Sequence, residues 1–155
     1  MWKNFKPHGL LATLSLFAML CLIACAGGHE LSAEVSQMGK DLQVKGQSNL
    51  PDQALILVSL LDPAKPDEMN RNVIVQEFAP LKAGAFSATL KPMTPVPAGK
   101  YLLRLRFRPP APSMPTQGEV LAAVGPNGEK LSGPRVVSDG DAKMLVHQQE
   151  IEYKP

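Results

Sequence analysis

The clearest chemical feature of the sequence is a stripe of basic side chains between positions 100 and 108. On an extended strand alternate side chains share a face and stand about 6.6–6.8 Å apart. Two sets result: Tyr101, Leu103, Leu105 and Phe107 lie on one face, and Lys100, Leu102, Arg104, Arg106 and Arg108 lie on the other. Guanidinium groups favour carboxylate and phosphate. The stripe therefore predicts a docking surface for an acidic partner or anionic headgroups, with a plainly solvated strand face as the alternative.

Metal ligands are sparse in the rest of the chain. A tether histidine, His29, and a strand histidine, His147, accompany scattered methionines at positions 38, 69, 93, 114 and 144. Thioether and imidazole ligands suit Cu(I), but no Met-x-Met or His-x-Met spacing occurs, and scattered methionine normally fills protein cores. The pair of carboxylates in Asp139-Gly140-Asp141 lacks the further oxygen ligands that calcium needs. We expect a turn there, and neither a metal nor a cofactor.

Motifs for catalysis are missing from the sequence. It contains no G-x-S-x-G, no phosphate-binding loop, no C-x-x-C and no H-E-x-x-H. Nucleophilic, nucleotide-dependent and zinc chemistry therefore have no support. We expect a protein that is not an enzyme.

The first 24 residues differ from the remainder and read as a targeting segment. Lys3 and Lys6 precede an uncharged, mostly apolar run of 16 residues, Gly9–Ala24. As a helix this run would span roughly 24 Å, which is short of the ~30 Å hydrocarbon core. A signal peptide over residues 1–24 is therefore favoured over an uncleaved anchor.

The residues that close this run, Leu22-Ile23-Ala24-Cys25, resemble the bacterial lipobox. The resemblance implies cleavage before Cys25 and attachment of a diacylglycerol to its thiol, often with a further acyl chain such as palmitate on the new amino group. Cys21 is a poorer candidate because Leu20 before it is not small. Ala26 follows where Asp would imply retention at the inner membrane, so the resemblance favours the outer membrane. Two or three acyl chains anchor stably where one does not.

Removal of the leader changes the charge balance of the chain. The full sequence has 16 basic and 14 acidic side chains, and both charges of the leader are lysines, so 14 of each sign remain. The mature chain of 131 residues has no overall basic character that would indicate nucleic-acid binding. Its one cysteine, Cys25, is the lipidation site, so no intramolecular disulfide is expected.

Short stretches of period-two alternation, interrupted by Gly, Pro, Asn and Asp, predict an all-β chain. The stretches are 42–46, 54–61, 72–78, 85–90, 100–108 and 143–153, with 31–37 as a possible seventh. Residues 54–61 are apolar on both faces, as in a central strand or a groove for a partner. Residues 119–124 fit a strand or one helical turn. We expect an antiparallel sandwich of six to seven strands over residues 37–155, preceded by an acylated tether over 25–36.

The expected core combines apolar residues from most of these strands. Its members are Leu42, Val44, Leu55, Leu57, Val73, Val75, Phe86, Leu90, Leu103, Leu105 and Phe107. Tyr101, at the start of the alternating strand, is a candidate for the tyrosine corner of a sandwich.

Turn and strand segments across the mature chain resemble those of bacterial envelope lipoproteins with an immunoglobulin-like domain. The segments are Val44–Asp52, Gly84-Ala-Phe86, Pro97-Ala-Gly99-Lys-Tyr101 and Val124–Gly133. This resemblance implies an immunoglobulin-like sandwich. A weaker likeness, through Leu50-Pro51 and Gly99-Lys-Tyr101, is to the small pilotin-type lipoproteins of type III secretion.

Together these observations predict a non-enzymatic protein of the bacterial cell envelope, anchored by lipid to the membrane and facing the periplasm. Its role would be that of an interaction or structural module for another envelope protein. One alternative is a pilotin-like assembly factor for a secretion-channel subunit. Another is a periplasmic carrier of a metal or small ligand.

Overall fold

The structure, a computed structural model, describes residues 27–66, 71–111, 113 and 117–155. The leader and Cys25 lie outside these residues. In chain order the elements are β1 (Leu31–Met38), β2 (Asp41–Ser48), β3 (Leu55–Leu61), β4 (Val73–Pro80), β5 (Ala85–Leu90), β6 (Gly99–Phe107), α1 (Gly118–Val124), β7 (Val136–Asp139) and β8 (Ala142–Tyr153). Within the described ranges, no helix has the length and apolar character needed to cross a membrane.

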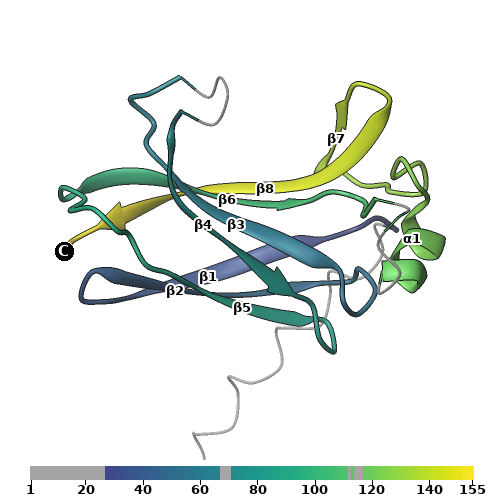
Figure 1. Cartoon of the computed structure of the whole chain (residues 1–155), viewed down its shortest axis with the longest axis horizontal. Coiled ribbons are helices and arrows are strands. Elements are labelled where there is room, and N and C mark those ends of the chain that lie inside the picture. The colour runs from purple at the N-terminus through teal and green to yellow at the C-terminus, as the bar shows by residue number, and fades with distance from the viewer. Residues whose placement is uncertain (1–26, 67–70, 112, 114–116) are drawn as a thin grey trace, which may run out of the picture.

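The strands form two sheets that lie over one another as layers (Figure 1). One sheet has three strands in the order β1-β2-β5, and the other has five in the order β4-β3-β6-β8-β7. Every pair of neighbours is antiparallel. The chain crosses between the layers after β2, β4 and β5. The predicted all-β antiparallel sandwich is therefore confirmed.

Two details of the predicted organisation are wrong. The described residues hold eight strands instead of six or seven. The additional one is β7, whose four residues between Pro134 and Gly140 are too few to display alternation. The sandwich also begins at Leu31 and not at residue 37, because β1 pairs with β2 over its whole length. The segment 119–124, left open between strand and helical turn, lies in α1.

The core lies between the sheets and contains most of the residues expected there. Leu42, Val44, Phe86, Leu90, Leu103, Leu105 and Phe107 are all buried in one cluster. On β3, however, the inward-facing residues are Ile56, Val58 and Leu60, which are fully buried. Leu57 is buried as expected, but it and Leu55 lie on the other side of β3, outside this cluster. The expected inner side of β3 was wrong, because the strand is apolar on both faces and its alternation does not identify the inner one. On β4, Val73 and Val75 are only half-buried.

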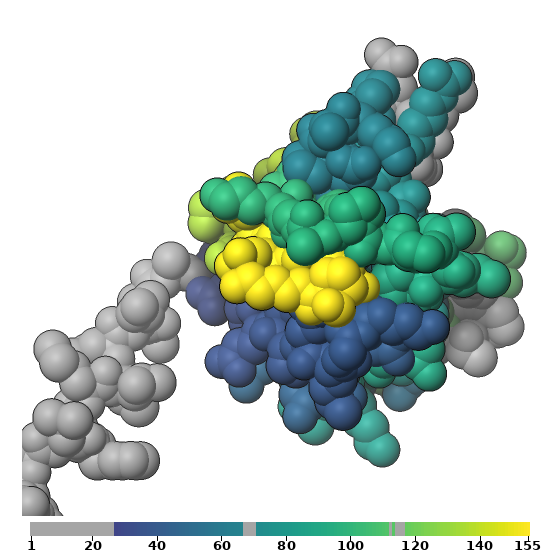
Figure 2. All heavy atoms as spheres, turned by 90° about the vertical axis from the view of Figure 1, so that its left-hand side faces the viewer, coloured from purple at the N-terminus to yellow at the C-terminus, as the bar shows by residue number. Residues whose placement is uncertain are grey.

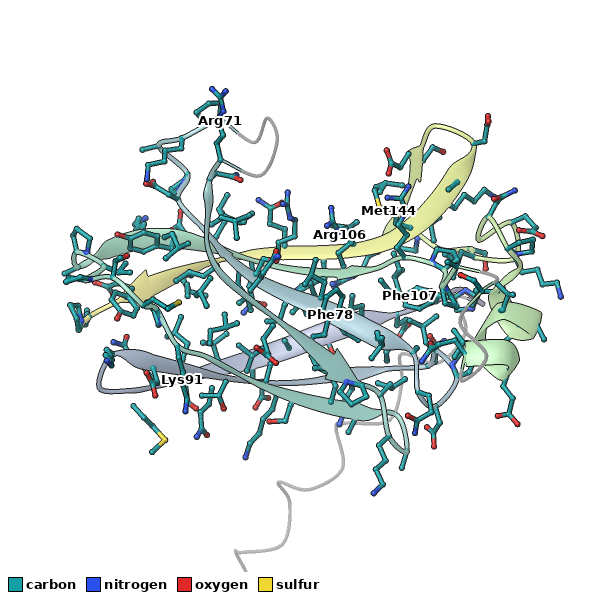
Figure 3. The ribbon with its side chains drawn as sticks, in the orientation of Figure 1. Arg71, Phe78, Lys91, Arg106, Phe107 and Met144 are labelled. Carbon is teal, nitrogen blue, oxygen red and sulfur yellow. The ribbon has the colours of Figure 1, made fainter. Side chains whose placement is uncertain are left out.

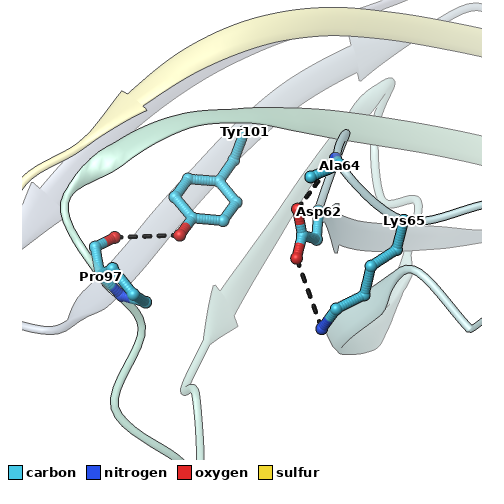
Figure 4. A network of polar contacts seen from close by, with 5 residues as sticks. All are labelled: Asp62, Ala64, Lys65, Pro97 and Tyr101. Atoms are coloured by element: carbon cyan, nitrogen blue, oxygen red, sulfur yellow. Dashed lines mark hydrogen bonds and ion pairs between the residues drawn. The ribbon is translucent and has the colours of Figure 1, made fainter.

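Tyr101 forms the corner contact expected of it. Its hydroxyl donates a hydrogen bond of 3.0 Å to the backbone oxygen of Pro97, four residues upstream (Figure 4). This backward bond at the start of a strand is the arrangement called a tyrosine corner in immunoglobulin-like sandwiches. The ring also meets Tyr153 edge to face, with centroids 6.0 Å apart. These contacts fix the entry into β6, which carries the basic stripe.

Both hairpins at the ends of the five-stranded sheet project away from the three-stranded sheet (Figure 1). One joins β3 to β4 and the other joins β7 to β8, so they stand over opposite edges of the sheet. Figure 2 looks onto the end that holds the C-terminus and shows the β3–β4 hairpin rising above β6 and β8. At the base of this hairpin, Asp62 accepts a hydrogen bond from the Ala64 N–H and pairs with Lys65 at 3.4 Å (Figure 4).

Candidate functional site

The basic stripe lies on the outer face of the five-stranded sheet. Strand β6 alternates as predicted, with Tyr101, Leu103, Leu105 and Phe107 buried between the sheets. The basic residues point the other way, Lys100 and Arg108 exposed and Arg104 and Arg106 half-buried. Figure 3 shows Arg106 on the side of the sheet away from β1, β2 and β5.

Ion pairs engage both ends of this stripe. The Lys100 Nζ lies 2.8 Å from Glu150 Oε1, and the Arg108 Nη2 lies 3.1 Å from Asp139 Oδ2. The hydrogen bond and the charge of Glu150 raise the pKa of Lys100. Such exposed pairs stabilise the fold little, but they neutralise the ends of the stripe. Between these paired ends lies the middle of the stripe.

Arg104 and Arg106 occupy that middle and have neutral neighbours across the strands. Arg104 stands between Ser59 on β3 and Gln148 on β8, and Arg106 stands between Leu57 and Val146. Both arginines also interact with other groups of the domain. A guanidinium has five N–H donors, so an internal partner uses only part of its capacity.

The outward-facing residues of β3 are buried beneath this layer. Leu57 and Ser59 are only 8% and 3% exposed, although they lie on the outer face. Directly opposed side chains on neighbouring strands have Cβ atoms about 4.5–5.5 Å apart, and arginine stems cover apolar surface while their charge stays in water. Arg106 thus lies beside two apolar residues, Leu57 and Val146, whereas Arg104 lies beside the polar residues Ser59 and Gln148.

Exposed apolar side chains flank the arginines on the same face. Phe78 on the edge strand β4 is paired in register with Leu57 and is 60% exposed. Val137 on the opposite edge strand β7 is paired with Met144 and is 42% exposed. Figure 3 shows Met144 on the same side of the sheet as Arg106. We call the surface formed by Leu57, Phe78, Arg104, Arg106, Val137 and Val146 the arginine face.

This combination was missed in the sequence. Phe78 and Val137 are far apart along the chain and far from the stripe, and the order of strands alone brings them to one surface. The polar pair Gln76-Glu77 before Phe78 was the available sign that β4 has a solvent-exposed part.

The groove envisaged along residues 54–61 is not present. Strand β3 is hydrogen-bonded to β4 on one side and to β6 on the other. It therefore offers no edge to a partner strand, and its apolar composition is explained by burial on both faces.

The candidate metal ligands do not converge in the described part of the chain. Across residues 27–66, 71–111, 113 and 117–155, no group of three or more His, Cys, Asp or Glu could hold an ion. His147 lies on the inner side of β8, and its Nε2 is 2.9 Å from Gln149 Oε1. Gly140, with φ 63°, lies in the predicted turn after Asp139.

The methionines do not fill the core as expected. Met38 is 62% exposed and Met93 is 99% exposed, while Met144 is half-buried on the outer face. Met69 and Met114 lie outside the described residues. Met38 ends β1 and Met93 lies in the loop after β5, where the sandwich is open to solvent.

A second organised region lies where the chain enters β1. The His29 N–H donates to Ser132 O at 2.6 Å, and the Ser132 N–H donates back to His29 Nδ1 at 3.2 Å. The Asn49 side chain donates to Gly28 O at 2.9 Å and accepts from the Glu30 N–H at 2.8 Å. We call this arrangement the N-terminal clamp. Residues 28–30, expected to belong to a tether, are instead held by the sandwich.

The remaining predicted site residue, Cys25, lies outside the described residues, three positions before the clamp. Comparison with protein-family models, with curated proteins and with solved structures finds no match to this chain.

Proposed function

We propose that this chain is a non-enzymatic, lipid-anchored protein of the bacterial envelope, which binds another envelope protein through the arginine face. The observation that carries the proposal is the composition of that face. Two half-buried arginines stand in its centre, and exposed apolar side chains, Phe78 and Val137, stand at its two edges. Central arginines within apolar surroundings are typical of binding surfaces.

The partner's surface should be acidic and apolar at once. Arg104 and Arg106 project from one strand at a spacing of about 6.6–6.8 Å, which suits two acidic groups of one extended segment. Phe78 and Val137 would contact apolar side chains on either side of that segment. Anionic headgroups would satisfy the arginines but give these edge residues no specific role, so we favour a protein partner.

The anchoring part of the proposal rests on the lipobox-like sequence that ends at Cys25. Ala26 after it supports the outer membrane, with the sandwich in the periplasm. The order of the strands supports an immunoglobulin-like relationship, because β1-β2-β5 faces β4-β3-β6-β8 as in sandwiches of that kind. The tyrosine corner supports the same relationship.

Site-specific photo-crosslinking in intact cells tests the proposal. A photoreactive residue is placed at position 78 on the arginine face or, as the matched control, at Gln47 on the outer face of the three-stranded sheet. We expect one stoichiometric envelope protein to crosslink from position 78 only, through a segment that contains Asp or Glu. The crosslink should disappear in the Cys25→Ser variant, which cannot be lipidated.

Charge reversal then tests the chemistry of recognition. The Arg104→Glu/Arg106→Glu variant should lose the crosslink while its thermal unfolding stays cooperative. Replacement of the partner's acidic residues by Lys should restore it. Equal crosslinking from positions 78 and 47, or no response of a folded variant to charge reversal, would contradict the proposal.

A further inference from the structure

The N-terminal clamp limits how far the domain can be from the lipid. Only Cys25, Ala26 and Gly27 separate the proposed lipid attachment from Gly28, the first residue that the sandwich holds. Three residues span at most about 10–11 Å when fully extended. For comparison, the eight residues of β1 cover roughly 26 Å. The stretch of chain that joins the lipid to the sandwich is therefore much shorter than the sandwich is along its strands.

The clamp is at one end of the sandwich. There Gly28 is hydrogen-bonded to Asn49 in the β2–β3 connection, and His29 is hydrogen-bonded to Ser132 in the segment before β7. Helix α1 and the β4–β5 turn lie at the same end (Figure 1). The β1–β2 turn, the loop after β5 and the C-terminus lie at the other end. We call the first of these the α1 end.

Charge does not dominate the α1 end. Its exposed cations Lys82 and Lys130 are balanced by the exposed carboxylates of Asp52, Glu119 and Glu129. Contact between the α1 end and anionic headgroups would therefore add little binding energy. The short stretch of chain between the lipid and Gly28 is the factor that positions the α1 end.

We infer that the α1 end is seated on the bilayer surface, so that the strands rise from the membrane and both outer sheet faces remain accessible. This inference rests on the proposed lipid anchor at Cys25. In this orientation the arginine face stands beside the membrane, where a partner in the periplasm can approach it.

The orientation is measurable because the mature chain offers a single cysteine, which the lipid occupies. A second cysteine can be labelled uniquely, at Ala123 on the exposed side of α1 or at Met93, which is 99% exposed at the opposite end. The acylated protein is reconstituted in phosphatidylcholine vesicles that contain a lipid with a nitroxide on its headgroup. We expect at least severalfold stronger quenching of a fluorophore at position 123 than at position 93.

Two further arms make the test decisive. Ten Gly/Ser residues inserted between Gly27 and Gly28 add about 16–19 Å of flexible reach, so quenching at position 123 should fall while the protein still floats with the vesicles. Addition of anionic lipid should leave the difference between the two positions unchanged. Equal quenching at both positions, or a difference that requires anionic lipid, would overturn the inference.

Anchoring and orientation fail in different ways. If the protein floats with the vesicles but the two positions are quenched alike, only the orientation is wrong. If the protein purified from membranes carries no lipid by intact mass and does not float, the proposed anchor is wrong and the orientation falls with it.

Discussion

The outer faces of the two sheets are built from the same strand alternation but differ in chemistry. On the three-stranded sheet most outward residues are small or polar, among them Ser32, Glu34, Lys45, Gln47, Ser87 and Thr89. The exception is Met38 at the end of edge strand β1, which is 62% exposed. Glu34 and Lys45 are directly opposed across β1 and β2. On the five-stranded sheet the centre holds Arg104 and Arg106, and the edges expose Phe78 and Val137.

The contrast matters because the need to remain soluble explains the residues on the outer face of the three-stranded sheet but not those on the arginine face. Small polar residues and an opposed charge pair are sufficient to keep a sheet solvated. Exposed aromatic and aliphatic residues on edge strands carry a risk of association. The arginine face is therefore the better candidate for a surface shaped by a partner.

The largest effect should come from the inner side of the strand that carries the arginines. Phe107 is 1% exposed, and Phe107→Ala should lower the free energy of unfolding by about 3–5 kcal/mol because it leaves a cavity. Arg106→Ala, next to it on the outer side, should cost only about 1 kcal/mol. Urea unfolding of both variants measures the difference. Similar losses in the two would mean that the arginine face is mainly structural.

On the three-stranded sheet, stability should depend on the absence of a side chain at Gly46. A Cβ atom there would collide with the backbone oxygen of Ser32 and with the ring of Phe86. Gly46→Ala should therefore destabilise the fold by about 1–3 kcal/mol through overpacking. Lys45→Ala, its outward neighbour, is the control and should change the urea midpoint little. An unchanged midpoint in Gly46→Ala would show that the Phe86 ring and the backbone at Ser32 can move aside at little cost.

Binding should depend on one outer face only. Arg104→Glu/Arg106→Glu should weaken the complex with the crosslinked partner at least tenfold, which corresponds to about 1.4 kcal/mol. Lys45→Glu on the other face should leave the affinity within about twofold. Titration of the purified partner at two salt concentrations measures both, and equal losses would remove the distinction between the faces.

The smallest effect should come from a carboxylate that belongs to neither face. The backbone N–H groups of Glu129 and Asn127 lower the pKa of Glu129, and the Asn127 bond is 3.0 Å long. Such a group stabilises the fold above its ordinary pKa, and this contribution disappears as the pH falls through the lowered value. The Glu129→Gln variant should thus be slightly less stable than the parent protein at pH 7. Well below a pH of about 4, the two proteins should have the same free energy of unfolding. A constant difference across that range would show that the charge is not involved.

Several parts of the fold could be predicted because they depend on neighbouring residues only. From Leu103 to Arg108 the chain alternates between apolar and basic residues, so a shift by one residue would bury three arginines. Strand β5 was predicted with its observed bounds. In β3 the same reasoning did not identify the inward face, since both of its faces are apolar. Strand β7 was too short to recognise.

By itself, the sequence determined the β-class of the domain, the two faces of β6, the corner role of Tyr101 and the presence of a lipobox-like segment before Cys25. Only the tertiary structure decided that Phe78 and Val137 share a surface with the arginines, and that Gly28 is held by Asn49 close to the start of the domain. The physical reason is that alternation is a local property of an extended chain. Strand order and loop contacts, in contrast, are chosen by how all the apolar faces are buried together.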